Sequence, residues 1–538
     1  MALFLVPLVA CTDWFDAVPD NGTIPDKKFF GDENAFYNAL IDVYTQLRSN
    51  DLYGENLTLG MLEFMSQDFI PYDTPSTDIS KFRYDTPENS TRIATVMREM
   101  YRAIASCNKI LEEIEHTDVS FYNPGQKEII TGELYALRGA LHFDLLRLFH
   151  PTVTREPGFS GLPYLTHFGT ETSRPQTSSQ LLRLILDDLS HAADLLREYD
   201  PILSGWNHSS VVLGQIDNRL RTFYLNYYAV TALQARIYLY MGDYKNALER
   251  AQETYSHLQK VEVSSQLFYF VSPGKYNSDF CFSREHIWGI SSMPDGFTAL
   301  SDTMFRTNLI TVRSDISAVF PDANDTRFRE WFTRQSNGSY TLQHKFGSST
   351  LLSGYIYSSS GSESDLPARI PVIKLGEVSL IAAEALNRDN KPDEAAEWLI
   401  EMQTSKRNSI VEQMKANGKI SVETIDAAIR DEYQREFWGE GQRFFFHKRM
   451  NDTRIVSYNG DSIDISSEQY RALAYKKAIP AICRDCSRRL RFLSGCRINE
   501  NAPPISPADN PIGNTLFLDG KILRPKKDVG ASATQNIE

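Results

Sequence analysis

A single cysteine near the start of the chain has the surroundings that lipid attachment requires. Cys11 ends the apolar run from Leu3 to Ala10, with a small residue directly before it and Leu8 three positions before it. This pattern is typical of the processing site of a bacterial lipoprotein, where the signal is cut and the thiol is acylated. Residues 12–30 would then form a tether. A chance cysteine is the alternative, because the usual basic start of a signal is missing.

The other cysteines predict no shared chemistry. Cys107 and Cys281 stand alone in apolar surroundings and are expected to be buried as small hydrophobic residues. Cys483 and Cys486 form a CxxC pair, with Cys496 ten residues on. A zinc site needs a fourth ligand, and no histidine follows residue 447. We therefore expect no metal and no cofactor; a labile disulfide is the alternative for the pair.

Charged residues near the end of the helical pattern could be acid/base groups or structural ion pairs. They are Glu436, Glu440, Arg443 and Arg449, with Glu377 and Glu384 seven positions apart on an earlier helix. Such sets on one amphipathic helix usually form structural ion pairs. The sequence has no nucleophile elbow, no HExxH motif and no phosphate-binding glycine loop. We expect no enzymatic activity.

Composition excludes two classes of protein. The formal net charge of -13 argues against nucleic acid as a partner, because phosphates attract a basic surface. No run of about 18 apolar residues exists, which predicts no membrane-spanning helix. At 42% hydrophobic residues the chain can bury a large core, and 26 tyrosines supply ring faces for contacts.

Helical periodicity predicts the elements that must position these groups. In the first half of the chain, helices are expected at 33–48, 92–115, 126–149 and from Thr177–Ser178 to 196, with Pro151 closing the third. A final helix is expected over 422–450, with a break at Gly439–Gly441.

Two helix pairs resemble tetratricopeptide repeats. Residues 223–240 predict a buried helix, a Gly-Asp-Tyr turn follows, and 245–258 predict a second helix with small residues at contact positions. A second copy occupies 375–386 and 393–406. Either a long insertion separates the two copies, or the repeats pack out of sequence order.

The remaining segments are richer in loops. Residues 260–370 have loop composition, with short strands expected at 266–271 and 285–290, and Trp288 expected to be buried. Residues 50–90 are also loop-rich. Residues 456–538 look atypical and disordered in composition.

Taken together, these segments resemble the SusD/RagB family, the outer-membrane nutrient-binding lipoproteins of the Bacteroidetes. The matching stretches occur in the family's order. They are Cys11, 100–108 (MYRAIASCN), 132–149 (GELYALRGALHFDLLRLF), 235–244 (ARIYLYMGDY), 371–377 (PVIKLGE) with 382–385, and 435–444 (REFWGEGQRF). Lys374 stands where the family has arginine, which keeps the charge and loses the planar fork. The basic, cysteine-bearing stretch after residue 480 departs from the family pattern.

The resemblance implies a mainly α-helical protein. Its scaffold would be tetratricopeptide-like helix pairs, with an irregular, loop-rich part containing short strands laid over it. The implied domains are a signal at 1–11, the tether, a single helical domain at 31–455 and the atypical segment 456–538. The implied function is capture of a glycan at the cell exterior and its delivery to a SusC-like TonB-dependent transporter. A lipid anchor on Cys11 would hold the protein on the outer membrane.

Sugar recognition needs flat apolar faces for C–H groups and polar groups for hydroxyls. We expect loop aromatics to supply the faces, since loops on a rigid scaffold often carry binding residues. The candidates are Tyr72, Tyr84, Trp206, Phe297, Tyr355 and Tyr357. For each, core packing or a solvated loop tip is the alternative.

Other functions remain open from the sequence. The protein could capture a peptide, as some members of that family do, or it could be a helical-repeat scaffold with no small ligand. A lipid-anchored hydrolase would need two carboxylates at a defined separation in a cleft, and the sequence offers no such pair.

Overall fold

The computed structural model describes most of the chain between residues 29 and 471. The described residues are 29–169, 174–204, 212–213, 216–271, 281–291, 311–342, 345, 369–471, 516–518 and 521–523. Cys11 and the cysteines at 483, 486 and 496 lie outside them. Cys107 and Cys281 are buried, as expected.

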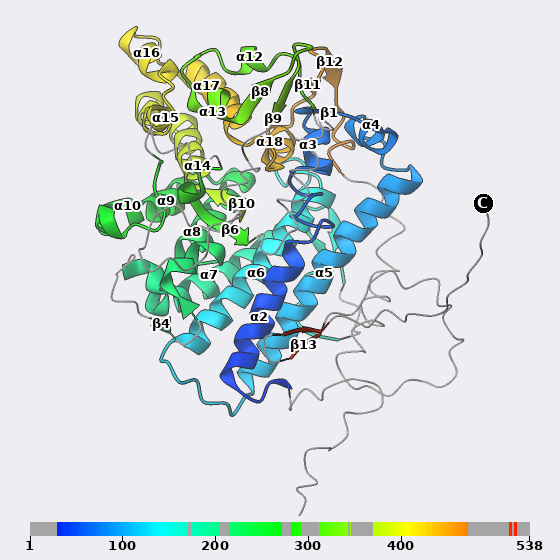
Figure 1. Ribbon diagram of the computed structural model, residues 1–538, viewed down its shortest axis with the longest axis vertical. Coiled ribbons are helices and arrows are strands. Elements are labelled where there is room, and N and C mark those ends of the chain that lie inside the picture. The colour runs from blue at the N-terminus through cyan, green and yellow to red at the C-terminus, as the bar shows by residue number, and fades with distance from the viewer. Residues whose placement is uncertain are drawn as a thin grey trace, which may run out of the picture.

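Four helix pairs form the scaffold and stack side by side (Figure 1). In chain order they are α2 (Glu33–Leu47) with α5 (Pro87–Glu115), α6 (Gln126–Phe149) with α7 (Ser178–Tyr199), α8 (Tyr227–Met241) with α9 (Tyr244–Tyr255), and α14 (Leu375–Arg388) with α15 (Pro392–Ser405). Each helix of this series contacts the next one. The helices predicted from periodicity are therefore confirmed, and the fold is mainly α-helical.

Local sequence signals set several helix ends. The Thr177 hydroxyl accepts a hydrogen bond from the Gln180 backbone N–H, and the Gln180 side chain accepts one from the Thr177 N–H in return. This capping box satisfies two backbone donors that would otherwise be unpaired at the start of α7. Helix α8 ends at Gly242, which adopts a left-handed φ of 78° that glycine accepts without strain.

The two repeat copies predicted from the sequence are neighbours in space. Helix α9 packs directly on α14, although the loop-rich insertion lies between them in the chain. Small residues Ala247 and Ala251 of α9 are fully buried. Of the two alternatives, a long insertion between adjacent repeats is the correct one.

The insertion contributes to the longest strand pair among the described residues. Strand β6 (His286–Ser291) runs antiparallel to β10 (Arg369–Lys374), and Trp288 is buried in it, as predicted. The strand predicted at 266–271 is absent. There the Phe268 ring stacks on His257, with centroids 4.3 Å apart, so burial of aromatic side chains produced a strand-like pattern in a segment that joins no sheet of the described residues.

Short elements complete the described structure. Within the insertion they are β7 (Thr311–Val312), α12 (Ile316–Val319), α13 (Thr326–Trp331), β8 (Phe332–Arg334) and β9 (Tyr340–Leu342). Elsewhere they are α3 (Met61–Met65), β1 (Phe69–Ile70), α4 (Thr74–Ser80), β2 (Ser160–Leu162), β3 (Gln176–Thr177), β4 (Val212–Leu213), β5 (Ile216–Asp217), α10 (His257–Lys260), α16 (Ile410–Ala416), β13 (Leu516–Leu518) and β14 (Lys521–Leu523). The loop-rich stretch 50–90 thus contains two short helices that its composition did not indicate.

The C-terminal helical region has the predicted break. Helix α17 (Val422–Glu436) and α18 (Gln442–Met450) are separated at Gly439–Gly441, and the hairpin of β11 (Arg454–Val456) and β12 (Ser462–Asp464) follows. Ile465 and Tyr470 belong to the main hydrophobic core. The helical domain therefore extends past the expected boundary at 455, to residue 471 at least.

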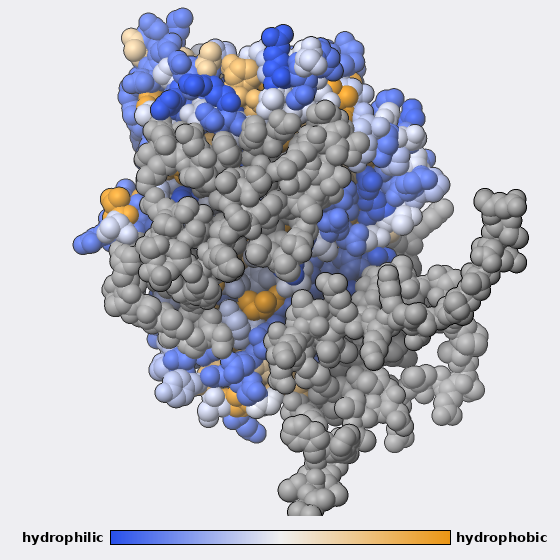
Figure 2. Space-filling model, in the orientation of Figure 1, coloured by the Kyte–Doolittle hydropathy of each residue, from blue (hydrophilic) through white to orange (hydrophobic). Residues whose placement is uncertain are grey.

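The face drawn in Figure 2 is mainly polar over its described residues. Figure 2 shows a mostly hydrophilic face outside the grey atoms, with apolar colour in small separate patches. Among the described residues, none of the helices combines the length and apolarity that crossing a membrane would take.

Gly441 provides a sharp test of this packing. Its φ is +68°, and a Cβ there would lie 2.3 Å from the backbone oxygen of Leu57. We expect Gly441→Ala to lower the free energy of unfolding by about 2–5 kcal/mol, from left-handed strain plus overpacking. Urea denaturation would measure the change.

Gly460→Ala is the matched control for Gly441→Ala. Gly460 has a φ of +90° with no atom within 4 Å of the added Cβ. In this variant only left-handed backbone strain should lower the free energy of unfolding, by about 1–2 kcal/mol. Equal losses in both variants would show that the contact with Leu57 is unimportant.

Candidate functional site

The charged residues singled out in the sequence form a buried ion-pair network. Arg327 contacts Glu432 and Glu436 through Nη1 at 2.7 and 2.9 Å, and all three side chains are fully buried. Lys374 bridges two carboxylates, with its Nζ 2.8 Å from an oxygen of Glu436 and 2.8 Å from an oxygen of Glu440. The compact lysine ammonium can serve two separate carboxylates because its three donors are not held in one plane.

Electrostatics in this network keep the Glu436 carboxylate ionised. Burial alone would raise the pKa of Glu436, but the cations Lys374, Lys406 and Arg327 hold it well below its usual range. Lys374 responds in the opposite direction. Burial favours its neutral form, yet Glu436 and Glu440 raise its pKa above the ordinary value.

The remaining charged candidates are also paired. Arg449 donates two hydrogen bonds to the Glu384 carboxylate, at 2.6 and 2.7 Å. Arg236 likewise donates two to the Glu377 carboxylate, from Nε and Nη2, both at 2.6 Å. The Arg443 guanidinium donates to Asp68. The prediction of structural ion pairs is confirmed for all of these residues. Buried and fully engaged, they offer no free acid or base to a substrate.

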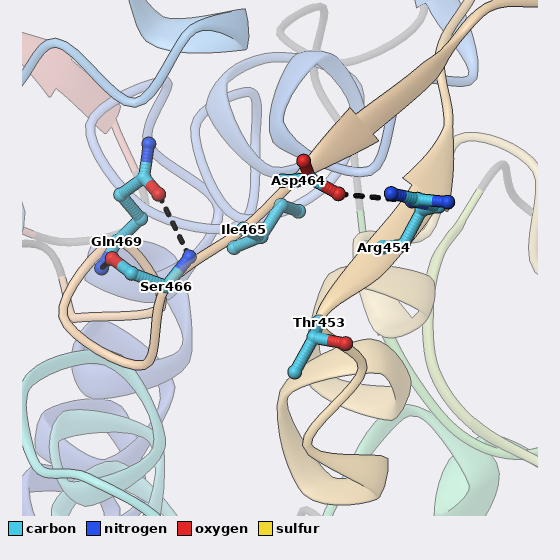
Figure 3. A pocket seen from close by; sticks show the side chains of 6 residues that line it. All are labelled: Thr453, Arg454, Asp464, Ile465, Ser466 and Gln469. Atoms are coloured by element: carbon cyan, nitrogen blue, oxygen red, sulfur yellow. Dashed lines mark hydrogen bonds and ion pairs between the residues drawn. The ribbon is translucent and has the colours of Figure 1, made fainter.

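An open cavity in the described part of the chain lies at the β11–β12 hairpin. It has a volume of about 600 Å³ and is lined by Thr453, Arg454, Asp464, Ile465, Ser466 and Gln469 (Figure 3). We call this surface the hairpin face. Antiparallel pairing puts Arg454 directly opposite Asp464, so both side chains reach the same side of the hairpin.

The polar groups of the hairpin face remain available to a ligand. The Arg454 Nε donates to the Asp464 Oδ1 at 2.9 Å, but the two side chains are 67% and 79% exposed. Such an exposed pair contributes about 0–1 kcal/mol, so a ligand hydroxyl can replace either partner at little cost. Ser466 and Gln469 are held by each other, because the Ser466 N–H donates to the Gln469 Oε1 at 2.8 Å (Figure 3).

The base of the hairpin face is fixed to the core. The Ile465 N–H donates to the Thr453 carbonyl at 2.8 Å, and the Ile465 side chain is buried. The Tyr84 hydroxyl donates to the Gln469 carbonyl. The cavity therefore combines a rigid floor with an exposed polar rim, which can bind a hydroxyl-rich ligand but holds no nucleophile activated by a base.

Tyr84 does not present its ring to solvent. Its side chain is 6% exposed and lies 6.5 Å from the Phe82 ring, centroid to centroid. Our placement of Tyr84 among the ligand-binding aromatics is therefore wrong. Its role is to support the hairpin face from below, because the loop that carries it turns into the core rather than away from it.

Tyr72 is exposed and lies at the same end of the molecule as the hairpin. Its side chain is 45% exposed, with its ring held edge-on against Phe64 at 5.8 Å. It follows β1, which pairs with β7. Just beyond β7, the Ser314 N–H donates to the carbonyl of Tyr458 in the hairpin turn. Figure 1 shows α3, α4, β1, β11 and β12 together on this end.

The other predicted binding residues cannot be placed. Trp206, Phe297, Tyr355, Tyr357 and the lipidation candidate Cys11 lie outside the described residues. Sequence reasoning also missed the hairpin. The Asn-Gly-Asp turn at 459–461 between two short runs was a usable signal, because such turns connect antiparallel strands. Within the described ranges, His, Cys, Asp and Glu side chains form no cluster able to hold a metal ion.

Comparison with known proteins gives two family-level matches. A model described as the SusD family matches residues 332–481, and one described as starch-binding and associating with the outer membrane matches residues 13–239. No curated protein sequence matches the chain.

Solved structures match over most of the chain. A SusD superfamily protein from Bacteroides thetaiotaomicron superposes with a TM-score of 0.64 at 20% identity, covering 83% of this chain and 97% of that one. A SusD superfamily protein from Bacteroides vulgatus gives 0.62 at 19% identity, covering 81% and 91%. A SusD-like carbohydrate-binding protein from Bacteroides vulgatus gives 0.59 at 18% identity, covering 80% and 85%.

Proposed function

Because this chain belongs to the SusD/RagB family, we propose that it binds a glycan at a cell surface and leaves the glycan chemically unchanged. The observation that carries the proposal is the hairpin face. It is an open, polar cavity of about 600 Å³ on a rigid floor. Cavities of about 300–1,000 Å³ are the usual size for small-ligand sites.

The chemistry of the hairpin face matches hydroxyl-rich ligands. Arg454 supplies donors, Asp464 supplies acceptors, and Ser466 and Gln469 supply both. Tyr72 adds an exposed ring at the same end of the molecule, where a sugar's C–H groups can rest on its face. The Tyr72 ring and the polar rim together satisfy the two requirements of sugar recognition.

Binding without catalysis is supported by the state of the carboxylates. Glu377, Glu384, Glu432, Glu436 and Glu440 are all buried and engaged by cations. The carboxylate that lines the cavity is Asp464, and among the lining residues it has no second carboxylate to act with. Glycoside hydrolysis needs two carboxyl groups flanking the bond.

Delivery and location complete the proposal. A lipid on Cys11 would hold the protein on the outer membrane, and the captured glycan would pass to a SusC-like TonB-dependent transporter. The family model that matches residues 13–239 is described as associating with the outer membrane, and a similar solved structure is described as carbohydrate-binding. Both descriptions support this proposal.

Affinity electrophoresis tests the proposed function. The protein would be run through native gels, each cast with one polysaccharide from a broad panel, and retardation would identify the ligand class. We expect Tyr72→Ala combined with Arg454→Ala and Asp464→Ala to weaken retention at least about tenfold, equivalent to about 1.4 kcal/mol. The unfolding midpoint should stay unchanged, because all three side chains are exposed.

Matched variants elsewhere control for surface changes. Tyr122 is 86% exposed in the loop between α5 and α6, and Arg197 forms an exposed pair with Asp194 on α7. Tyr122→Ala combined with Arg197→Ala should leave retention intact. Retention that survives the hairpin-face variant would exclude that surface. A folded protein that no polysaccharide retards would contradict glycan capture and favour peptide capture.

A further inference from the structure

A second cavity lies between the outer helices of two adjacent pairs. It has a volume of about 370 Å³ and is bordered by α9 and α10 on one side and by α15 on the other. Its lining residues are Gln252, Tyr255, Gln259, Glu397, Trp398 and Glu401. We call it the α9–α15 groove. In Figure 1 the helices α9, α10 and α15 lie on the left of the view, and β11 and β12 lie at its upper right.

Two aromatic rings form the floor of the groove. The Tyr255 and Trp398 rings meet edge to face, with centroids 4.8 Å apart and an interplanar angle of 69°. Tyr255 is almost buried, while Trp398 is only half-buried and presents part of its indole to the cavity. The Tyr255 hydroxyl donates to the Glu401 carboxylate, which fixes both groups.

Polar side chains form the rim on both sides. Gln252 and Gln259 are seven positions apart, which spaces them by about 10 Å along the helix direction. Both are exposed, and within the described residues their amide groups make no hydrogen bond. Glu397 and Glu401 face them from α15, one turn apart. The two glutamine amides of the rim can therefore donate hydrogen bonds to a ligand and accept them from it.

The charge of the lining selects among ligands. The ionisable lining groups are the two carboxylates and the Tyr255 phenol, and Glu397 forms an ion pair with Lys415. A carboxylated or sulfated sugar would be repelled, because like charges at short range raise the free energy of binding. An uncharged, hydroxyl-rich ligand suffers no such penalty.

We propose that the α9–α15 groove is a second binding site, specific for a neutral oligosaccharide. The sugar's C–H groups pack on the indole ring of Trp398. Gln252 and Gln259 form hydrogen bonds with the sugar hydroxyls, and the Glu401 carboxylate accepts hydrogen bonds from those hydroxyls. This site is independent of the hairpin face. Two sites on one rigid body raise the retention of a long polymer well beyond that of a short oligomer, because the second contact forms at high effective concentration.

The test uses the full chain in native gels cast with neutral soluble starch, dextran or mannan, and with anionic polygalacturonate. The background is the triple hairpin-face variant, Tyr72→Ala with Arg454→Ala and Asp464→Ala. We expect residual retardation by at least one neutral polymer and none by polygalacturonate. Adding Trp398→Ala should weaken the residual retention tenfold or more.

A second variant protects the test against a folding defect. Trp398 packs partly on the core, whereas Gln252 and Gln259 are exposed, so Gln252→Ala with Gln259→Ala should weaken retention while leaving the melting temperature unchanged. Tyr122→Ala and Gln413→Ala are the controls. The proposal is overturned if the triple variant retains no neutral polymer, or if both groove variants bind like their parent. Full loss on the triple variant would still leave the proposed function of the hairpin face intact.

Discussion

Replacing Arg327 with alanine is expected to lower the free energy of unfolding by about 3–5 kcal/mol, because it leaves buried carboxylates without their cation. The Arg327 guanidinium is fully buried and contacts Asp325 at 2.7 Å, Glu432 at 2.7 Å and Glu436 at 2.9 Å. Water entering the vacated space could donate hydrogen bonds, but it could not supply the positive charge that offsets the three carboxylates. Urea denaturation at neutral pH measures the change.

The Arg327 contact joins two parts of the chain that are distant in sequence. Arg327 lies in α13 of the insertion, whereas Glu432 and Glu436 lie in α17. Loss of the cation should therefore detach the insertion from the helices beneath it. Limited proteolysis of the variant is expected to cut first within the insertion.

One further variant separates charge from geometry in this cluster, and a second variant outside the cluster is its control. Arg327→Lys keeps the charge but loses the planar fork. We therefore expect its free energy of unfolding to lie between those of the wild type and the alanine variant. Arg454→Ala removes an arginine from an exposed pair and should cost less than about 1 kcal/mol. A loss at Arg327 as small as that at Arg454 would refute the structural role of the buried network.

A pH-dependent effect is expected from Glu63. Its side chain is fully buried in α3, and its Oε1 accepts a hydrogen bond from the Gly441 N–H at 2.7 Å. Burial, reinforced by the nearby Asp68 carboxylate, raises the pKa of Glu63 to about 8. Gly441 and the more distant Lys345 oppose this shift.

The direction of the pH effect follows from the raised pKa. In the unfolded chain Glu63 loses its proton near its ordinary pKa of 4.5. Between about pH 4.5 and pH 8 the folded protein therefore binds more protons than the unfolded chain, so this residue lowers stability as the pH rises. Below pH 4.5 both states are protonated, and above pH 8 both are ionised, so the dependence ends at each limit.

Glu63→Gln removes this dependence, because glutamine does not titrate and can still accept from the Gly441 N–H. We expect the variant to gain stability over the wild type between pH 5 and pH 8, by at least about 1.4 kcal/mol, which corresponds to one pKa unit. Urea midpoints at a series of pH values would measure it. Glu88→Gln, in the exposed first turn of α5, is the control and should follow the wild type.

The opposite trend at Glu63 would be informative. If the glutamine variant lost stability relative to the wild type as the pH rose, the Glu63 carboxylate would have to be ionised and stabilised in the folded protein. The cations Arg443 and Lys345, which act on Glu63, would then outweigh the effect of burial.

Local patterns were enough to locate the helical scaffold. The leucines of α6 recur at steps of three and four, and Thr177 stands where α7 begins, because both signals act within one or two turns of a helix. The same local reasoning failed at 266–271. An aromatic run has the same composition whether its side chains enter a core or its backbone joins a sheet, and only a pairing strand distinguishes the two.

The candidate site shows the same limit. Tyr72 and Tyr84 lie in one loop-rich stretch and have the same side chain, yet one is exposed and the other is buried under Gln469. Their environments depend on the hairpin, which is distant in sequence. The α9–α15 groove was likewise invisible, because Tyr255 and Trp398 come from different repeats.

The helix pairs, the break before α18, the membership of the charged residues in ion pairs and the resemblance to a family could all be predicted from the sequence. These features depend on short-range periodicity, capping and motif order. The sequence did not predict which carboxylate pairs with which cation, which tyrosine faces solvent or where the cavities open. Those outcomes depend on contacts between distant segments, and the free energy of burying a side chain is set by neighbours that local sequence does not specify.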